Sequence, residues 1–491
     1  MLAHLPVLHV IIPMMAAPAC LILRRRDLVW LVALAATLMS VVVSYALLMQ
    51  VLESGPINYE FGGWEAPWGI EYRIDLLNAP LLLLISTISA VALFAARKSI
   101  ESEIPKDRHS LFYIAWLLCM SGLLGILATG DAFNVFVFLE ISSLSAYTLI
   151  ALGKNRKALW ASYQYLIAGT IGATFILIGI GLMYMMTGTL NMADMSERLP
   201  EVSSSRTVFT AFAFFIVGVC LKLALFPLHL WLPNAYAFAP SVVTAFLAAT
   251  ATKVAVYVLI RFKYGIFGFD FAFSSLPLQS IFLTLGLAGI FIASIAAIYQ
   301  DNLKKLLAYS SVAQIGYLIV GLGLANETGL MATLLHMLNH GLMKGALFLA
   351  VAAIVFRLGQ AKLSEMHGLA SRMPWTMAAF LIGGLSLIGV PLTVGFVSKW
   401  YLVTAAIEHA WWPVAGLILL GSILSVIYIW KVVETVYFKP VNEHTAQIKE
   451  APIAILAPTW LLVIANLYFG INTDLTVGIT RLAASTTFGG M

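Results

Sequence analysis

The sequence predicts an all-α polytopic membrane protein with about 14 transmembrane helices. Of its 491 residues, 61% are hydrophobic and only 10% are charged, whereas a soluble globular domain carries about 25% charged residues. Apolar stretches of about 20 residues, the length that crosses a bilayer, follow one another with short loops between them. This composition excludes a large soluble core, and the net charge of +5 is no sign of nucleic-acid binding.

Fourteen segments meet the length criterion for a transmembrane helix. The longest polar interludes, 53–75 and 191–206, are too short for a soluble domain, so we expect a single transmembrane domain over 1–491. No basic stretch precedes the first apolar run, which argues against a cleavable signal peptide. The expected spans are 4–23, 28–51, 76–96, 110–129, 132–152, 161–187, 207–237, 241–262, 277–299, 306–325, 329–357, 375–407, 412–437 and 452–470.

Cations are distributed unevenly between the two sets of loops. If the spans alternate strictly, one side receives 18 Lys and Arg residues and the other receives six. Cytoplasmic loops are enriched in Lys and Arg, so we expect the first side to be cytoplasmic and both termini to lie outside. The six cations assigned to outer loops are Arg73, Arg198, Arg206, Arg261, Lys263 and Arg481.

Five charged residues fall within the apolar spans: Glu140, Lys222, Lys253, Lys344 and Lys399. Placing one such charge at the centre of a membrane helix costs roughly 2.5–3.5 kcal/mol, so intramembrane charges usually pair or line an ion path. Glu140 is the expected counter-ion for one lysine. A lysine that alternates between a carboxylate and a neutral neighbour has an adjustable proton affinity, which suits a proton relay. A static ion pair would explain one Glu–Lys pair but leaves three lysines unexplained.

The eleventh span, in the segment LLHMLNHGLMKGALF, carries His336, His340 and Lys344 at four-residue steps. That spacing places the three side chains along one helical stripe of about 12 Å. Histidine titrates near neutral pH, so the stripe could pass protons along the membrane plane. Zinc is the alternative for a His-x3-His pair, but no Cys, Asp or Glu lies nearby as a third ligand, and we expect no metal.

Two spans contain a proline next to a buried lysine. Pro227 follows Lys222 in the seventh span, and Pro391 precedes Lys399 in the twelfth. Because proline removes a backbone donor, we expect both helices to be broken there. Broken helices at corresponding places in two halves of a transporter are typical of inverted repeats. We therefore expect two inverted five-helix repeats, spans 4–8 and spans 9–13, in units of about 110–262 and 277–437.

Several polar residues have two possible roles. His229 could join the relay or bond a carbonyl freed by Pro227, and Asp131, at a helix start, suits capping better than transport. Cys20, Cys119 and Cys220 lie in apolar runs with no ligand spacing, so we expect buried thiols. The hydroxyl and amide side chains that could order water near the charges, or bond their own backbone, are Ser142, Ser143, Ser145, Thr148, Thr250, Thr252, Ser310, Ser311 and Gln314.

These motifs together resemble a known family. They are the glutamate of the fifth span, Lys-x4-Pro in the seventh, the lysine of AATATKVAVYVLIR in the eighth, His-x3-His-x3-Lys in the eleventh and GVPLTVGFVSK in the twelfth. The set resembles the antiporter-like proton-channel subunits shared by respiratory complex I, membrane-bound hydrogenases and Mrp-type cation/proton antiporters. Within that family, the segment GVCLKLALFPLHLWLPNAYAFAP is most similar to the D-type component of the multisubunit Na⁺/H⁺ antiporter.

The resemblance implies a role for each buried charge. Glu140 and Lys222 would form the central switch, and Lys253 the middle relay. His336, His340 and Lys344 would connect it to Lys399, the distal site that exchanges with a half-channel or a neighbouring subunit. The family fold implies 14 helices with the seventh and twelfth discontinuous. It also implies obligatory partners in a prokaryotic cell membrane, namely other subunits of a hetero-oligomeric complex of the Mrp A, B, C, E, F and G type.

Three functions remain open. The chain could be the proton-translocating subunit of an Mrp-type Na⁺/H⁺ antiporter, a secondary active transporter, with Na⁺ passing elsewhere in the complex. It could instead be a membrane-arm subunit of a complex I-like or hydrogenase complex driven by redox chemistry, or a scaffold that keeps unused charges. No Gly-rich strand–turn–helix and no cysteine cluster is present, so we expect no cofactor and no catalysis in this chain.

Overall fold

Long apolar helices build almost the whole protein. The computed structural model describes residues 2–23, 25–269, 271 and 277–489. Within them, 13 helices are long and apolar enough to cross a membrane, and α15 (Pro374–Ile388) with α16 (Val394–Glu408) makes one further broken span. The expectation of about 14 spans is confirmed. The 13 helices are α1 (Leu5–Ile22), α2 (Arg26–Ser54), α3 (Ala79–Glu103), α4 (His109–Ala128), α5 (Ala132–Ala151), α6 (Lys157–Thr187), α8 (Arg206–Leu223), α10 (Ser241–Gly265), α12 (Leu278–Ile298), α13 (Leu303–Gly323), α14 (Glu327–Leu358), α17 (Trp412–Val433) and α19 (Ile453–Ile471).

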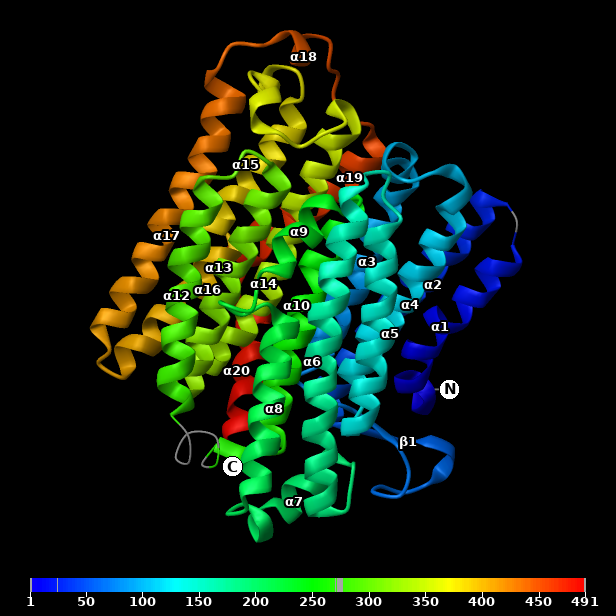
Figure 1. Ribbon diagram of the computed structural model, residues 1–491, viewed down its shortest axis with the longest axis vertical. Coiled ribbons are helices and arrows are strands. Elements are labelled where there is room, and N and C mark those ends of the chain that lie inside the picture. The colour runs from blue at the N-terminus through cyan, green and yellow to red at the C-terminus, as the bar shows by residue number, and fades with distance from the viewer. Residues whose placement is uncertain (1, 24, 270, 272–276, 490–491) are drawn as a thin grey trace.

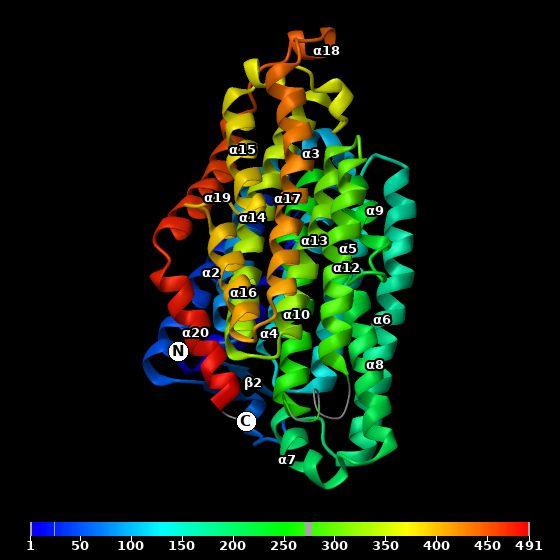
Figure 2. The same cartoon turned by 90° about the vertical axis from the view of Figure 1, so that its left-hand side faces the viewer.

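The two ends of the bundle differ (Figure 1). Helix α7 (Met192–Val202), strand β1 and both chain termini lie towards one end, which we call the α7 end. Helix α18 (Glu443–Ala446) lies at the opposite end, which we call the α18 end, and the second view agrees (Figure 2). Both termini therefore share one side of the bundle, as an even number of crossings requires.

The seventh span is discontinuous, as predicted. Helix α8 ends at Leu223, Ala224 adopts a left-handed conformation with φ 61°, and the chain resumes as α9 (Trp231–Phe238). The break exposes carbonyls that have lost their helical donors. The indole nitrogen of Trp231 donates to one of them, the carbonyl of Leu221, at 3.0 Å. A specific side chain thus satisfies one of the carbonyls at the break.

The twelfth span is also discontinuous, as predicted. Helix α15 ends at Gly389, whose φ of 95° lies in the left-handed region, and Leu392 has φ 70° before α16 begins. The angle of Leu392 lies at the edge of the left-handed region that L-residues can enter, whereas that of Gly389 lies well beyond it, so Gly389 is the position that requires glycine. The break leaves the carboxyl end of α15 facing the start of α16.

The polar interludes fold into structure that hydropathy does not predict. Strands β1 (Ile57–Glu60) and β2 (Glu71–Ile74) form an antiparallel hairpin, with Tyr59 opposite Tyr72, at the α7 end. Helix α7 covers part of the same end, and the C-terminal helix α20 (Asp474–Gly489) packs against α14. The remaining short turns are η1 (Leu2–His4), η2 (Phe61–Gly63), η3 (Lys106–Arg108), η4 (Leu363–Glu365), η5 (Leu369–Ser371) and the π-helical η6 (Glu434–Phe438).

Helices α10, α13 and α14 form the centre of the bundle. Nearly all residues of α10 and α13 are buried, whereas α1, α6, α17 and α19 leave much of their apolar surface uncovered. Helix α14 packs against α10, α13, α16 and α19, so it connects both halves of the chain. The central helices also carry Lys253, His336, His340 and Lys344, which places the predicted relay in the interior.

Candidate functional site

Lys222 and Glu140 form the predicted pair. The Lys222 ammonium lies 4.0 Å from Glu140 Oε1 and donates a 2.8 Å hydrogen bond to the hydroxyl of Ser143, one turn further along α5. The side chain of Lys222 is only 5% exposed, while that of Glu140 is 28% exposed. The ammonium therefore has two alternative oxygen partners, one charged and one neutral, as a switch requires.

A small cavity leads from Lys222 towards α10. It has a volume of about 30 Å³ and is lined by Ser142, Ser143 and Lys222 on one side and by Ala251 and Val254 of α10 on the other. A site needs at least about 10–15 Å³ to hold a water, so this cavity has room for one or two. It lies between Lys222 and the helix that carries Lys253.

Lys253 is fully buried on α10. Its ammonium donates to the carbonyl of Ala248 at 2.5 Å, and the hydroxyl of Thr252 lies 3.4 Å away. Among the described residues no carboxylate lies within ion-pair distance of Lys253. It is thus bound only by neutral oxygens, unlike Lys222.

The two histidines of α14 stack on each other. The rings of His336 and His340 are nearly parallel, with an interplanar angle of 4° and a centroid distance of 5.8 Å. His336 Nδ1 lies 2.8 Å from the Ser398 hydroxyl on α16. Within the described part of the chain, neither ring nitrogen of His340 nor Nε2 of His336 has a hydrogen-bond partner. Unpaired polar atoms are costly to bury, and such sites are often functional or water-linked.

Lys344 continues the stripe on α14. Its ammonium donates to the Leu307 carbonyl at 2.9 Å and to the Ser310 hydroxyl at 2.5 Å, both on α13. Helix α14 packs against α10, which carries Lys253, and against α13. The structure therefore brings α10 and α14 together at the predicted connection, and Gly341 allows the Ala249 carbonyl of α10 to approach.

Lys399 lies at the break in the twelfth span. Its ammonium donates to the carbonyls of Leu387 and Ile388, at 3.0 and 2.9 Å, and lies 4.8 Å from the centre of the Tyr317 ring. These carbonyls end α15, where the helix dipole is negative, so the cation stabilises the break. His336 lies within hydrogen-bond distance of Ser398, the residue before Lys399 in the chain.

The accessory residues separate into two kinds. Asp131 is the N-cap of α5 and accepts a 2.7 Å hydrogen bond from the Asn134 amide, which is the capping role that the sequence favoured. His229 is buried beside Phe226, 5.4 Å between ring centres, and interacts with the Pro227 carbonyl. Ser143 and Ser310 bind lysines, whereas Ser142, Thr148, Thr250 and Ser311 bond carbonyls of their own helices.

One assignment from the sequence is wrong. Arg261 and Lys263 were counted with the outer loops, at the edge of the expected span 241–262, but both lie in the last turns of α10. Lys263 is fully buried and donates to the Tyr264 hydroxyl and the Leu322 carbonyl. Arg261 makes a two-pronged ion pair with Asp75. A signal was available, since Lys253, Tyr257 and Arg261 recur every four residues and share one face of the helix.

Taken together, fold and site define a polytopic membrane protein with a series of buried basic groups from α8 to α16. A model described as "NADH:quinone oxidoreductase/Mrp antiporter, TM" matches residues 129–427. The chain belongs to this family, and it is an antiporter-like, multi-pass membrane subunit of the kind found in Mrp and complex I-like complexes. The matched region contains every predicted relay residue.

Curated relatives carry two kinds of name. The N-type component of the NADH-quinone oxidoreductase of Desulforudis audaxviator is 41% identical, over 96% of this chain and 97% of the relative. The D-type component of the Na⁺/H⁺ antiporter of Alkalihalophilus pseudofirmus is 31% identical, over 79% of this chain and 78% of the relative. Its counterpart in Bacillus subtilis is 27% identical, over 98% of this chain and 96% of the relative. The chain is thus similar to subunits of both an oxidoreductase and an antiporter.

Two solved structures share the fold. A chain of the Mrp complex from Dietzia sp. superposes with a TM-score of 0.90 at 24% identity, covering 99% of this chain and 97% of that one. A chain of an archaeal membrane-bound sulfane sulfur reductase superposes with a TM-score of 0.87 at 30% identity, covering 99% of this chain and 97% of that one. Both neighbours are subunits of multisubunit membrane complexes.

Proposed function

We propose that this chain translocates protons through its buried basic groups, as one subunit of a hetero-oligomeric Na⁺/H⁺ antiporter. The observation that carries the proposal is the series of buried cations with neutral oxygen partners, which begins at a single Lys–Glu pair. A static scaffold gains nothing from unpaired lysines in hydrocarbon, because each is costly to insert. A relay needs such groups, since each must lose and regain a proton.

In the proposed path, the Glu140–Lys222 pair is the switch. When Lys222 moves from Glu140 to Ser143, it loses a charged partner and binds its proton less tightly. The cavity beside Lys222 would hold the water that carries this proton to Lys253. His340, His336 and Lys344 form the connection, and Lys399 is the distal group that exchanges with solvent or a neighbouring subunit. His229 lies beside the first break and is an accessory candidate.

The proposed path carries protons, not sodium. Na⁺ prefers several oxygen ligands, and carboxylates above all. Among the described residues along the path, Glu140 is the only carboxylate, while the other members are basic. Sodium would therefore cross at an interface or in a partner of the Mrp A, B, C, E, F and G type. The relatives named as antiporter components support the antiporter version.

A second candidate is a proton-pumping subunit of a complex I-like or hydrogenase complex. The specific observation in its favour is the 41% identity with the N-type component of an NADH-quinone oxidoreductase across nearly the whole chain. The same relay would then be driven by electron transfer in other subunits, and this chain would still carry no cofactor. The two candidates differ in the driving reaction rather than in the path.

The orientation and the repeats are part of the proposal. We place the α7 end and both termini outside a prokaryotic cell membrane and the cation-rich α18 end in the cytoplasm. We also propose that residues of about 110–262 and 277–437 are inverted repeats, because each contains one broken helix with a buried lysine beside the break.

Everted membrane vesicles test the proposal. The chain is expressed with its genomic neighbours in a sodium-sensitive bacterial host, and the collapse of a preformed pH gradient is recorded after NaCl is added. We expect sodium-dependent collapse in the wild type and none in Lys222→Ala. Lys98→Ala, a lysine on the exposed α3 surface, serves as the matched control and should behave as wild type. An assembled complex with no sodium response favours the redox-driven candidate. Normal exchange by Lys222→Ala refutes the central switch.

A further inference from the structure

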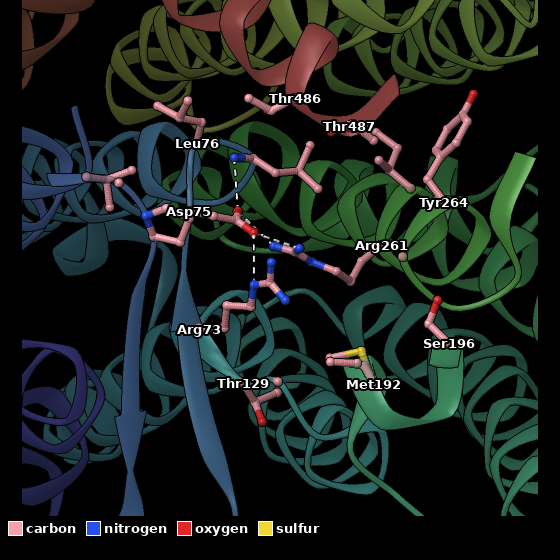
Figure 3. A pocket seen from close by; sticks show the side chains of 18 of the residues that line it. Arg73, Asp75, Leu76, Thr129, Met192, Ser196, Arg261, Tyr264, Thr486 and Thr487 are labelled. Atoms are coloured by element: carbon pink, nitrogen blue, oxygen red, sulfur yellow. Dashed lines mark hydrogen bonds and ion pairs between the residues drawn. The ribbon is translucent and has the colours of Figure 1, made fainter. Parts of the chain in front are cut away.

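A large cavity opens at the α7 end, beside the C-terminal end of α10 (Figure 3). It has a volume of about 530 Å³ and lies between the hairpin, α7, α10 and α20. Rim residues such as Leu52 and Leu482 are exposed, and Ser196 of α7 and Thr486 of α20 also line it. None of the relay groups lies in this cavity, so the proposed proton path does not account for it.

An ion pair lies on the wall of this cavity. Arg261 donates to both oxygens of Asp75, at 2.8 and 2.9 Å, and Arg73 approaches the same carboxylate at 3.8 Å (Figure 3). The Arg261 and Asp75 side chains are 15% and 14% exposed, whereas Arg73 is 44% exposed. The inner pair is thus largely shielded from solvent, and Arg73 lies on its solvent side.

A polar line continues from this pair into the bundle. Arg261 Nε donates a 3.0 Å hydrogen bond to the hydroxyl of Tyr257, and that hydroxyl donates to the Leu127 carbonyl at 3.0 Å. Lys253 lies four residues further along the same face of α10, a rise of about 6 Å. Asn78 joins the loop to this line by donating to the carbonyls of both Arg73 and Leu127 at 2.7 Å.

We infer that the cavity is an aqueous half-channel for Lys253 and that the Asp75–Arg261 pair is the plug that closes it. The inference rests on the proposed function, because it gives the middle relay its own exit at the α7 end. With the pair closed, Arg261 separates the water of the cavity from Tyr257. When the pair separates, Arg261 can move out towards solvent, and the Tyr257 hydroxyl becomes the first group that water can reach on the way to Lys253.

The charge of the plug also determines what it blocks. A guanidinium repels an approaching hydronium or metal cation, while Asp75 keeps Arg261 in place by two parallel hydrogen bonds. Lysine could supply the charge but not both bonds. The pair therefore closes the path both by occupying it and by electrostatics, and a leak is expected when either property is lost.

Passive proton leak tests the plug. The assembled complex is reconstituted into vesicles without sodium, a potassium diffusion potential is imposed with valinomycin, and proton entry is followed with a pH-sensitive dye. The informative variant is Asp75→Asn with Arg261→Gln, because removing both charges leaves no unpaired ion in the buried part of the site, and Arg73 is exposed to solvent. We expect its leak to exceed that of the wild type at least about tenfold, because the guanidinium that repels an approaching cation is gone. Adding Lys253→Ala should abolish the extra leak.

Two further variants make the result specific. The exchanged pair Asp75→Arg with Arg261→Asp should restore much of the seal. Arg198→Gln, which breaks a 2.8 Å pair with Asp194 on α7 at the same end, should leave the leak unchanged. As a direct probe of the cavity, Ser196→Cys should react with a membrane-impermeant thiol reagent added from the α7 side.

The inference is overturned if the double-neutral variant assembles and stays as tight as the wild type. It is also overturned if the leak survives Lys253→Ala. If the double-neutral variant does not assemble, Arg261→Lys must leak more than the wild type. If neither the double-neutral variant nor Arg261→Lys assembles, the ion pair is needed for folding, and the proposal that it closes the channel is also overturned. None of these outcomes depends on sodium, so they are distinct from normal exchange by Lys222→Ala, which would refute the proposed function.

Discussion

At the scale of single residues, the charged groups differ mainly in their partners. Lys222 has one carboxylate and one hydroxyl, Lys253 has neutral oxygens, and Lys399 has two helix-terminal carbonyls. These partners stabilise an ammonium to different extents, so the groups hold their protons with different strengths. The proposed relay requires groups whose proton affinities differ in this way.

The partner of Lys222 can be tested by an isosteric change. Glu140→Gln keeps the shape of the side chain but removes the charge that draws Lys222 away from Ser143. We expect sodium-dependent exchange in everted vesicles to fall roughly a hundredfold, the scale of losing an acid–base group, while the amount of assembled complex is unchanged. Glu434→Gln, in η6 at the edge of the bundle, is the control. Exchange at the wild-type rate in Glu140→Gln would show that the pair is structural.

The distal group gives an independent test of the length of the path. Lys399→Ala removes the cation at the second break, and we expect exchange to fall by a similar factor because the relay would end at His336. The measurement is the same vesicle assay, with the amount of complex in the membrane as its control. Full activity in this variant would confine the path to the first of the two proposed repeats.

Asp75 provides a prediction about pH. Burial alone would raise the pKa of this carboxyl, but the guanidinium of Arg261, with help from Arg73, holds it below its ordinary value of 3.8. A carboxyl with a lowered folded-state pKa stabilises the fold fully above its unfolded pKa, and this stabilisation is lost as the pH falls through the folded pKa. The thermal stability of the purified complex should therefore lose this contribution only below about pH 4. Asp75→Asn should remove that part of the pH dependence, and an unchanged profile would contradict the ion pair.

At the scale of elements, the two breaks are stabilised differently. The first is closed by the neutral indole of Trp231 and the second by the cation of Lys399. Lys222 is therefore free to exchange partners without loosening its own break, whereas any movement of Lys399 uncovers the end of α15. We expect the second break to change shape during turnover more than the first.

Gly389 is the position where the second break is most sensitive. An added Cβ would lie 3.0 Å from Lys399 Cδ, and φ is 95°. We expect Gly389→Ala to destabilise the complex by about 1–3 kcal/mol through backbone strain and to reduce exchange by displacing Lys399. Melting temperature and vesicle exchange measure the two effects. Gly416→Ala, in α17 with nothing within 4 Å of an added Cβ, should change neither, and equal behaviour of the two variants would contradict the role of the break.

At the scale of the whole molecule, hydropathy and buried charge predicted the spans, both breaks and the interior position of the charged residues, because each leaves a local mark in the sequence. The hairpin, α7 and α20 were missed, since short amphipathic or polar segments give no hydropathy signal. Arg261 was placed in a loop because a cation near a helix end resembles a loop residue. Its partner Asp75 is 186 positions away in the chain, and no local pattern identifies such a pair.

Both termini lie at the α7 end, and their side of the membrane can be tested. Epitope tags at the N- and C-termini should both be cleaved by protease added to spheroplasts, because the proposed orientation places the α7 end outside. A tag inserted near α18 should be protected until the membrane is opened. Protection of both terminal tags would reverse the orientation and move the proposed plug to the cytoplasmic side.

The burial of α10 has a consequence for biogenesis. This helix carries Lys253, Arg261 and Lys263, and almost none of its surface is left to face lipid. It leaves the ribosome before α13 and α14, two of the helices that enclose it, have been synthesised. During that interval Lys253, at the middle of the helix, lacks much of its final surroundings, at an insertion cost of roughly 2.5–3.5 kcal/mol. The nascent chain must therefore be sheltered by the insertion machinery, or by neighbouring subunits, until the second half arrives.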